Sequence, residues 1–268
     1  MGRMQRTVTS HIALNVTETA DLVFAIAVAD AYAPASESFA ATIDGAPLTP
    51  TELRDAHGGR LHRLRATPGR LVVDYAATID GAAEPLGAED TELLVYGRPS
   101  RYAESDALAP TAAAEFDGID GDAALLTAVS SWVGTQLSYV SGSSLPTDGA
   151  VRTLLARRGV CRDYSHLCVA LLRARGVPAR LVAVYAPGLD PMDFHAVAEA
   201  WVDGRWCVVD ATTLAPRESL VRVATGRDAA DTAFLNVLDG RADLVEMEVT
   251  ATVDALPADD LDELVSIH

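Results

Sequence analysis

The stretch Arg157–Leu181, "RRGVCRDYSHLCVALLRARGVPARL", has the strongest helix pattern of the chain and contains two of its three cysteines. We expect this helix to run from Cys161 to Arg175 and to end at Gly176, which favours a left-handed cap. At a helix N-terminus, the free N–H groups and the positive end of the dipole stabilise a thiolate. The pattern therefore indicates Cys161 as a candidate nucleophile.

The other two cysteines are expected to be structural. Cys168 follows Cys161 by two helical turns, about 10 Å of rise, so the two thiols are too far apart for a disulfide. Apolar residues surround Cys168 in the sequence, which favours a buried thiol. An odd number of cysteines without an export signal favours a reducing compartment, and we expect a cytoplasmic protein.

Composition limits the classes of partner. The 268 residues are 49% hydrophobic and 22% charged, with a formal net charge of −17, which is typical of an acidic globular protein. The arginines are scattered along the chain, so we expect neither nucleic acid nor an anionic membrane as a partner. The first sixteen residues lack the apolar run of a signal peptide. The oligomeric state is left open.

The first hundred residues show short extended segments separated by turns. The candidate strands are "TVTSHIAL", "DLVFAIAVA", "SFAATI", "RLHRLRA", "RLVVDYAATI" and "TELLVYG", and turn formers such as Asp44-Gly45 and Asp80-Gly81 lie between them. This spacing predicts an antiparallel β-sandwich over residues 1–104.

A different period begins after residue 104. Helices are predicted over 122–137, 150–157 and 161–175, followed by a strand over 179–186 and a hairpin around Asp203-Gly204. A further strand near 245–253 could join either sheet. The whole chain is therefore predicted to be α+β, with the sandwich followed by an α/β domain over residues 105–268.

The hairpin pairs a histidine with a carboxylate. If the turn is the two-residue Asp203-Gly204 loop, strand alternation places His195 and Asp210 on one face as diagonal neighbours, roughly 7 Å apart at Cβ. Cys207 then points to the opposite face, away from His195. Asp210 is therefore a candidate for orienting the imidazole.

Two further residues could support this site. Glu199 shares the face of His195 and is a rival orienting acid, although a charge satisfied by a neighbouring arginine is its better interpretation. His166 lies about 140° around the helix from Cys161, so it is either a structural residue or one that supports the site from behind. We expect Asp210→Asn to reduce turnover far more than Glu199→Gln, with both variants melting close to the parent.

Three segments together resemble one enzyme family. "GVCRDYSHL", "DFHAVAEAWVDGRWCVVDAT" and "VRVATGRDAADTAFL" resemble the bacterial transglutaminase-like cysteine peptidases of the transglutaminase/papain-like superfamily. The preceding strands and "YGRPSRYAESD" resemble the N-terminal β-domain of this group. The resemblance implies a papain-like transglutaminase core, with a catalytic Cys-His-Asp triad at Cys161, His195 and Asp210. Val197 stands where this family leads us to expect an aromatic residue.

The resemblance implies attack on an amide of a peptide or protein substrate through a thioester acyl-enzyme. Hydrolysis is the expected outcome, with transamidation of protein glutamine or a non-catalytic binding protein as alternatives. The Cys161 N–H would be one oxyanion donor, and Tyr139 or Gln136 could supply a second. No cofactor is implied, and the sequence has no CxxC or HxxxH spacing for a metal.

Overall fold

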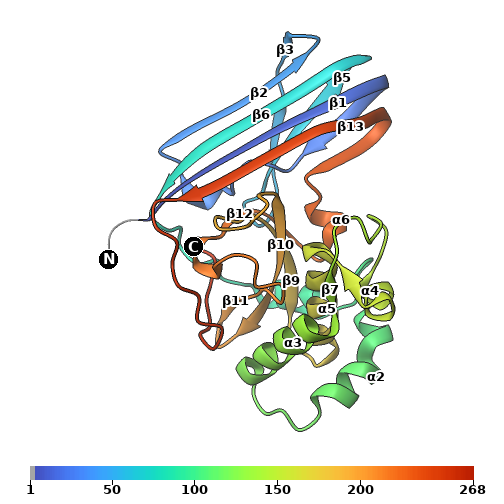
Figure 1. The fold of residues 1–268 in the computed structure, drawn as a ribbon, viewed down its shortest axis with the longest axis vertical. Helices are drawn as coiled ribbons and strands as arrows, with labels where there is room; N and C mark the ends of the chain where they lie inside the picture. The colour runs from blue at the N-terminus through green and yellow to red at the C-terminus, as the bar shows by residue number, and fades with distance from the viewer. Residues whose placement is uncertain (1–3) are drawn as a thin grey trace.

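The computed structural model describes residues 4–268, and its N-terminal layer is one curled antiparallel sheet of seven strands (Figure 1). The strand order is β3-β2-β6-β1-β5-β4, and β13 pairs with β1. The strands are β1 (Gln5–Phe24), β2 (Ser36–Ile43), β3 (Ala46–Leu48), β4 (Thr51–Arg54), β5 (Arg60–Ala66), β6 (Gly69–Asp80) and β13 (Leu235–Val253).

The last long strand connects the end of the chain to its beginning. β13 runs antiparallel to β1 from the Arg6–Val253 pair to the Phe24–Leu235 pair. The strand that the sequence left unassigned between two sheets therefore joins the N-terminal one. A short helix, α6 (Ala229–Thr232), precedes β13.

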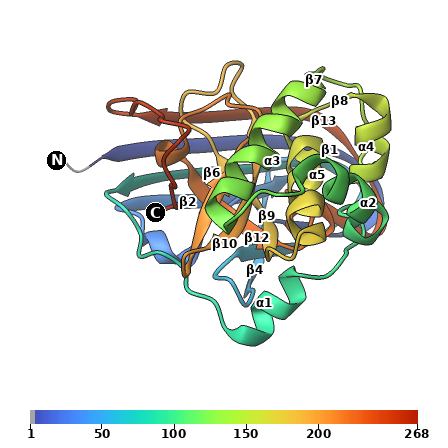
Figure 2. The same cartoon turned by 90° about the horizontal axis from the view of Figure 1, so that it is seen from below.

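The second half of the chain builds a four-stranded sheet with helices on one side. Its strand order is β11-β10-β9-β12. Seen from below, α2, α3, α4 and α5 gather in front of this sheet (Figure 2). The elements of this half are α2 (Ser105–Phe116), α3 (Asp122–Gln136), β7 (Ser138–Tyr139), α4 (Ala150–Ala156), β8 (Arg158–Gly159), α5 (Cys161–Ala174), β9 (Ala179–Tyr185), β10 (Phe194–Val202), β11 (Arg205–Val209) and β12 (Val221–Gly226). Single 3-10 turns lie at Asp30–Tyr32 in the first half and at Arg217–Ser219 in the second.

Apolar side chains fill the spaces between these layers. The seven-stranded sheet packs against the smaller sheet through residues such as Tyr185 and Val221. The helices also pack against the smaller sheet, and Cys168 of α5 and Cys207 of β11 lie in the core between them. Because α5 is buried against β9 and β10, its first residue is held at a fixed place beside the sheet.

The predicted α+β class is confirmed, with three differences in detail. The first two candidate strands, "TVTSHIAL" and "DLVFAIAVA", form the single strand β1, which ends at Phe24. The N-terminal strands form one hydrogen-bonded sheet instead of the two sheets of a sandwich. The segment "TELLVYG", predicted as a strand, is the helix α1 (Asp90–Tyr96). Asp90 and Glu92 lie in its first turn, where negative charge favours a helix N-terminus. The division of the chain at residues 104 and 105 stays a prediction.

No helix within residues 4–268 is both long enough and apolar enough to cross a membrane.

Candidate active site

Cys161 is the first residue of α5, and the turn before it is fixed by hydrogen bonds. Asp163 Oδ2 accepts from the Val160 N–H at 2.8 Å and from Ser144 Oγ at 2.5 Å. A Cβ on Gly159 would lie 2.6 Å from that of Asp163, so only glycine fits there. This tight turn leaves the N-terminal N–H groups of α5 and the Cys161 thiol at the open end of the helix.

His195 is placed by the predicted hairpin. The strands β10 and β11 pair in the predicted register, with Trp201 opposite Trp206 and Ala200 opposite Cys207. His195 Nε2 lies 3.0 Å from Asp210 Oδ2, and both side chains are buried. The diagonal contact between His195 and Asp210 that the register predicts is therefore present.

The Asp210 carboxylate is held by its own turn. Its Oδ1 accepts from the Thr212 N–H at 2.9 Å and from Thr212 Oγ1 at 2.6 Å. Only Oδ2 is then directed at His195. The two oxygens thus have separate partners, which fixes the plane of the carboxylate relative to the imidazole.

The electrostatics of the pair favour the charged forms of both groups. Burial alone would lower the pKa of the His195 imidazolium. The charge of Asp210, its hydrogen bond to the ring and the adjacent Cys161 thiol outweigh this effect and raise the pKa of His195 to about 10. Burial likewise opposes the Asp210 carboxylate, yet His195 and Thr212 hold its pKa below the usual value. Nδ1 of His195 is buried and makes no hydrogen bond of ordinary length within residues 4–268. It is the ring nitrogen left to exchange a proton with the thiol.

Ser165, which sequence reasoning missed, connects the cysteine helix to the histidine strand. Its buried Oγ lies 2.9 Å from both the Cys161 carbonyl oxygen and the Ala196 carbonyl oxygen. The hydroxyl thus fixes the start of α5 against the residue next to His195. A hydroxyl one turn after Cys161, on the same face of the helix, was the signal that could have indicated it.

The two oxyanion candidates have different surroundings. Burial raises the pKa of the Tyr139 phenol to about 12, and hydrogen bonds with the N–H and the thiol of Cys161 also influence it. Tyr139 therefore lies at the thiol. Gln136 instead accepts a hydrogen bond from Arg157 Nη1 at 2.6 Å through its Oε1. Only Tyr139 is brought to Cys161.

His166 points away from Cys161 and has a structural setting. Its Nε2 accepts from the Ala229 N–H at 3.1 Å, and its ring stacks on Tyr102 at 5.5 Å between centroids. Burial lowers its pKa to about 4, so the ring is neutral at physiological pH. It connects α5 to α6 and does not touch His195.

Glu199 is a buried structural anion. Its carboxylate is fully buried between Arg180 and Arg222, with contacts of 2.8 Å and 2.5 Å. Burial opposes its charge, but the two arginines overcome this and lower the pKa to about 2. Arg180 also lies 3.8 Å from the centroid of the Trp206 ring. Glu199 thus has arginine partners, as the sequence interpretation favoured. Asp210, and not Glu199, is the carboxylate that contacts His195.

The other two cysteines are fully buried, whereas Cys161 is partly exposed. Burial raises the pKa of both the Cys168 and the Cys207 thiol. Cys207 lies on the helix side of the sheet, away from His195, as the register predicts. Neither thiol is placed to act as a nucleophile.

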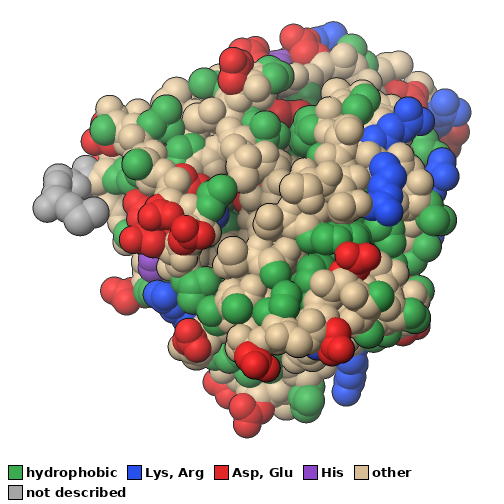
Figure 3. Space-filling view, turned by 60° about the horizontal axis from the view of Figure 1, so that its bottom comes forward, with side chains coloured by type: hydrophobic (Ala, Val, Ile, Leu, Met, Phe, Trp, Pro, Cys, Tyr) green, Lys and Arg blue, Asp and Glu red, His purple; other side chains and the backbone are tan. Residues whose placement is uncertain are grey.

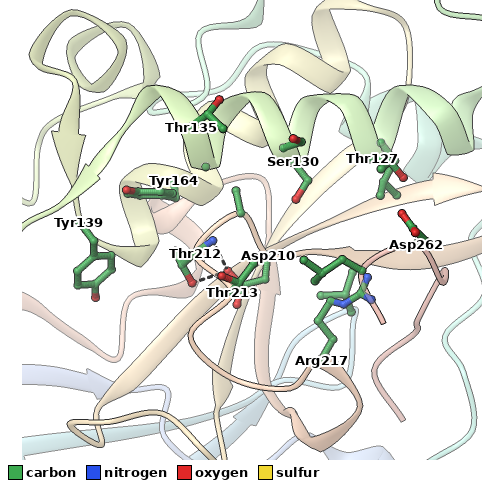
Figure 4. A pocket seen from close by; sticks show the side chains of 16 residues that line it. Thr127, Ser130, Thr135, Tyr139, Tyr164, Asp210, Thr212, Thr213, Arg217 and Asp262 are labelled. Carbon is green, nitrogen blue, oxygen red and sulfur yellow. Dashed lines mark hydrogen bonds between the residues drawn. The ribbon is translucent and has the colours of Figure 1, made fainter. Parts of the chain in front are cut away.

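A groove begins at this site and follows α3 (Figure 4). Its volume is about 470 Å³. Tyr139 and Tyr164 line one end, and Asp210 lies near its middle. Arg217 and Asp262 lie at the other end. Acidic side chains are spread over the face shown in Figure 3, in keeping with the net charge of −17.

Within residues 4–268, no group of three or more His, Cys, Asp and Glu side chains is arranged to hold a metal ion.

A cysteine at a helix start, beside a His–Asp pair on a hairpin, defines the transglutaminase-like class of α+β folds. Residues 110–211 match the profile of the transglutaminase-like superfamily. The crystal structure of a cysteine protease candidate from Cytophaga hutchinsonii superposes with a TM-score of 0.89 at 31% identity, covering 99% of this chain and 97% of that one.

Mycobacterial relatives extend the comparison. The uncharacterized protein Rv2569c of Mycobacterium tuberculosis is 30% identical over 256 residues, which cover 77% of this chain and 81% of the relative. The uncharacterized protein ML0607 of Mycobacterium leprae is 27% identical over 139 residues, and the chain spans only half of that relative. The chain belongs to the transglutaminase-like superfamily.

Proposed function

We propose that the protein is a cysteine-dependent amide hydrolase that cleaves peptide or isopeptide bonds through Cys161, His195 and Asp210. The observation that carries this proposal is the 3.0 Å contact between His195 Nε2 and Asp210 Oδ2, which leaves Nδ1 for a thiol at the start of α5. A nucleophile, a base and an orienting acid in this order are the parts that acyl transfer requires.

In the first half-reaction, His195 Nδ1 takes the proton of the Cys161 thiol, and the thiolate attacks the amide carbon. The pKa of His195, raised to about 10, favours this imidazolium–thiolate pair. When the tetrahedral intermediate collapses, the imidazolium gives its proton to the departing amine, and a thioester remains on Sγ. Water then attacks the thioester while His195 accepts a proton, and the carboxylic acid leaves.

The oxyanion has two proposed donors. The Cys161 N–H lies at the positive end of α5, where negative charge is stabilised. The Tyr139 phenol is the second, because it lies against the same N–H and the thiol. Burial raises the pKa of Tyr139 to about 12, so it keeps its proton and can donate it to an oxyanion.

The alternatives share the same fold. Transamidation would use an amine in place of water against the same thioester, so the two activities differ only in the second half-reaction. A non-catalytic binding protein would have no need of a thiol beside a buried imidazole and carboxylate. The arrangement of all three groups favours an enzyme.

An acyl-enzyme assay tests the proposal. With p-nitrophenyl acetate, we expect a burst of one p-nitrophenol per protein and an acetyl group on Cys161, located by peptide mapping. Cys161→Ala should lose both, whereas Cys207→Ala should retain them. A blocked peptide p-nitroanilide then tests amide cleavage. Acetylation at another residue, or a burst that survives in Cys161→Ala, would exclude this nucleophile.

A further inference from the structure

The groove beside the thiol has one wall made by a single face of α3. Thr127, Ser130, Ser131 and Gly134 line it at helical spacings of three and four residues. Figure 4 shows Ser130 pointing into the groove from this helix. The Thr127 and Thr135 hydroxyls instead donate to the Ala123 and Trp132 carbonyl oxygens of the same helix. The backbone of α3 comes close to the opposite wall, since a Cβ on Gly134 would lie 2.8 Å from the Ala211 carbonyl oxygen. The wall offers uncharged hydroxyl groups.

The opposite wall is the turn that follows Asp210. Thr212 and Thr213 line the groove there. Thr213 has a φ of 52°, a left-handed conformation that a β-branched residue rarely adopts. Such strain persists only where the surroundings impose it, and it is common at ligand-binding sites. Thr212 Oγ1 donates to Asp210 Oδ1 at 2.6 Å, so the turn contributes the Thr213 hydroxyl to this wall.

The groove runs past two residues that contact the catalytic pair. Tyr139, which contacts Cys161, lines one end, and Asp210, which contacts His195, lines its middle. In the proposed mechanism the departing nitrogen receives its proton from His195. The groove that passes the carboxylate holding His195 is therefore the path offered to the chain on the nitrogen side of the scissile bond.

The length of the groove sets the size of its ligand. From Thr127 to Thr135 along α3 the axial rise is about 12 Å. An extended peptide advances about 3.3 Å per residue, so this length fits about three or four residues.

The far end carries one negative charge. The Arg217 guanidinium is already used, because its Nε donates to Asp259 Oδ1 at 3.0 Å and its Nη2 donates to the Asp260 carbonyl at 2.6 Å. The Asp262 carboxylate lines the groove and has no ion pair or hydrogen bond within residues 4–268. The far end therefore favours a cation and disfavours an anion.

We propose that this groove binds the amine-side segment of the substrate, an extended peptide of about three or four residues with uncharged small side chains and a basic residue at its far end. This inference rests on the proposed amide hydrolase. By microscopic reversibility, the same groove accepts an added peptide amine when the acyl-enzyme is formed from an ester.

The test measures acyl transfer from acetyl-enzyme made with p-nitrophenyl acetate. The acceptors are alaninamide, Ala-Ala-Ala-Arg-amide and the neutral analogue Ala-Ala-Ala-citrulline-amide, and the acetylated products are quantified by mass spectrometry. We expect the arginine peptide to accept at least about tenfold faster than alaninamide. It should also exceed the citrulline peptide by about fivefold, the size of an exposed ion pair.

Three variants locate the effect. Asp262→Asn should remove the preference for arginine over citrulline, and Ser130→Phe, which fills the groove, should remove the advantage of the longer peptides. Asp203→Asn removes the same charge at the distant hairpin turn, where Asn-Gly is favoured, and should retain both preferences. The burst amplitude gives the reactive fraction of each preparation, to which transfer rates are normalised.

The outcomes separate the two proposals. A burst with equal acceptor rates in the parent overturns the groove assignment and leaves the hydrolase intact. An arginine preference that survives in Asp262→Asn overturns the role of that carboxylate. If no burst occurs at Cys161, the proposed function fails, and this inference fails with it.

Discussion

His195 Nε2 lies 3.0 Å from Asp210 Oδ2, while Oδ1 of the same carboxylate is already occupied by the N–H and hydroxyl of Thr212. Because both Thr212 groups are donors, the amide oxygen of Asn in Asp210→Asn would take the Oδ1 position and its NH2 would face the imidazole. Nε2 must then accept a hydrogen bond, which moves the ring proton to Nδ1, the atom needed as a base.

We therefore expect Asp210→Asn to lower kcat by several orders of magnitude, with a loss near 10⁴ as the upper bound from serine proteases. A thiol needs less help from its base, so the loss should be smaller here. Steady-state kinetics and the burst rate with p-nitrophenyl acetate check this. A variant with nearly normal turnover would show that His195 does not depend on this carboxylate.

Glu199→Gln should act on stability instead. The substitution leaves Arg180 and Arg222 buried beside a neutral amide, and breaking a buried ion pair by removing one partner costs on the order of 3–5 kcal/mol. The sequence led us to expect that this variant melts close to the parent. The buried ion pairs lead us instead to expect a large loss of unfolding free energy. Urea unfolding measures the free energy, and Glu248→Gln on the exposed face of β13 is the control. Equal midpoints for the two variants would contradict this prediction.

The comparison of Asp210 with Glu199 shows how far sequence reasoning reached. The alternation of a hairpin closed by Asp203-Gly204 was enough to place His195, Asp210 and Cys207 on the correct faces, because this register depends only on local turn geometry. The arginines that neutralise Glu199 come from β9 and β12, and no local pattern predicts that three strands bring these charges together.

The missed elements have the same physical cause. "TELLVYG" has the residues of a strand, but it lies outside both sheets, and the structure forms α1 there. Strand propensity depends on a partner more than on the backbone. The pairing of β13 with β1, more than 200 residues apart, also leaves no local signal.

The three thiols should differ in reactivity. Cys161 is partly exposed, whereas Cys168 and Cys207 are fully buried with raised pKa values. During brief exposure to iodoacetamide near neutral pH, we expect alkylation of Cys161 alone, because the thiolate is the reactive form. Peptide mapping by mass spectrometry gives the extent at each site. Modification of Cys207 first, or equal modification of all three, would be incompatible with this site.

The His195–Asp210 pair should also appear in the pH dependence of stability. The pKa of His195 rises from 6.5 to about 10 on folding, so its contribution is complete below pH 6.5 and is lost as the pH rises through about 10. The pKa of Asp210 falls below 3.8, so its contribution is present above that pH and is lost on acidification.

The free energy of unfolding should thus decline between pH 6.5 and 10 in the parent. In Asp210→Asn this decline should be largely absent. Without the carboxylate, the buried imidazole is neutral in the folded state, and above pH 6.5 it is also neutral in the unfolded state. Urea titrations at a series of pH values provide both curves. Parallel curves for parent and variant would show that the pair is not charged.

The last prediction concerns the strained turn at Thr213, where φ is 52°. A non-glycine residue in the left-handed region costs roughly 1–2 kcal/mol, whereas glycine adopts it freely. Thr213→Ala and Thr213→Gly both remove the hydroxyl, so their difference in unfolding free energy isolates the backbone. Glycine should be the more stable of the two by about 1 kcal/mol. At Thr127, in the middle of α3, the same pair of substitutions should reverse the order, because glycine is the poorer helix former.

Both Thr213 variants should lose acyl transfer to the tetrapeptide, and glycine should lose more because the turn it frees no longer directs the groove wall at α3. If alanine is the more stable variant at residue 213, the turn carries no strain.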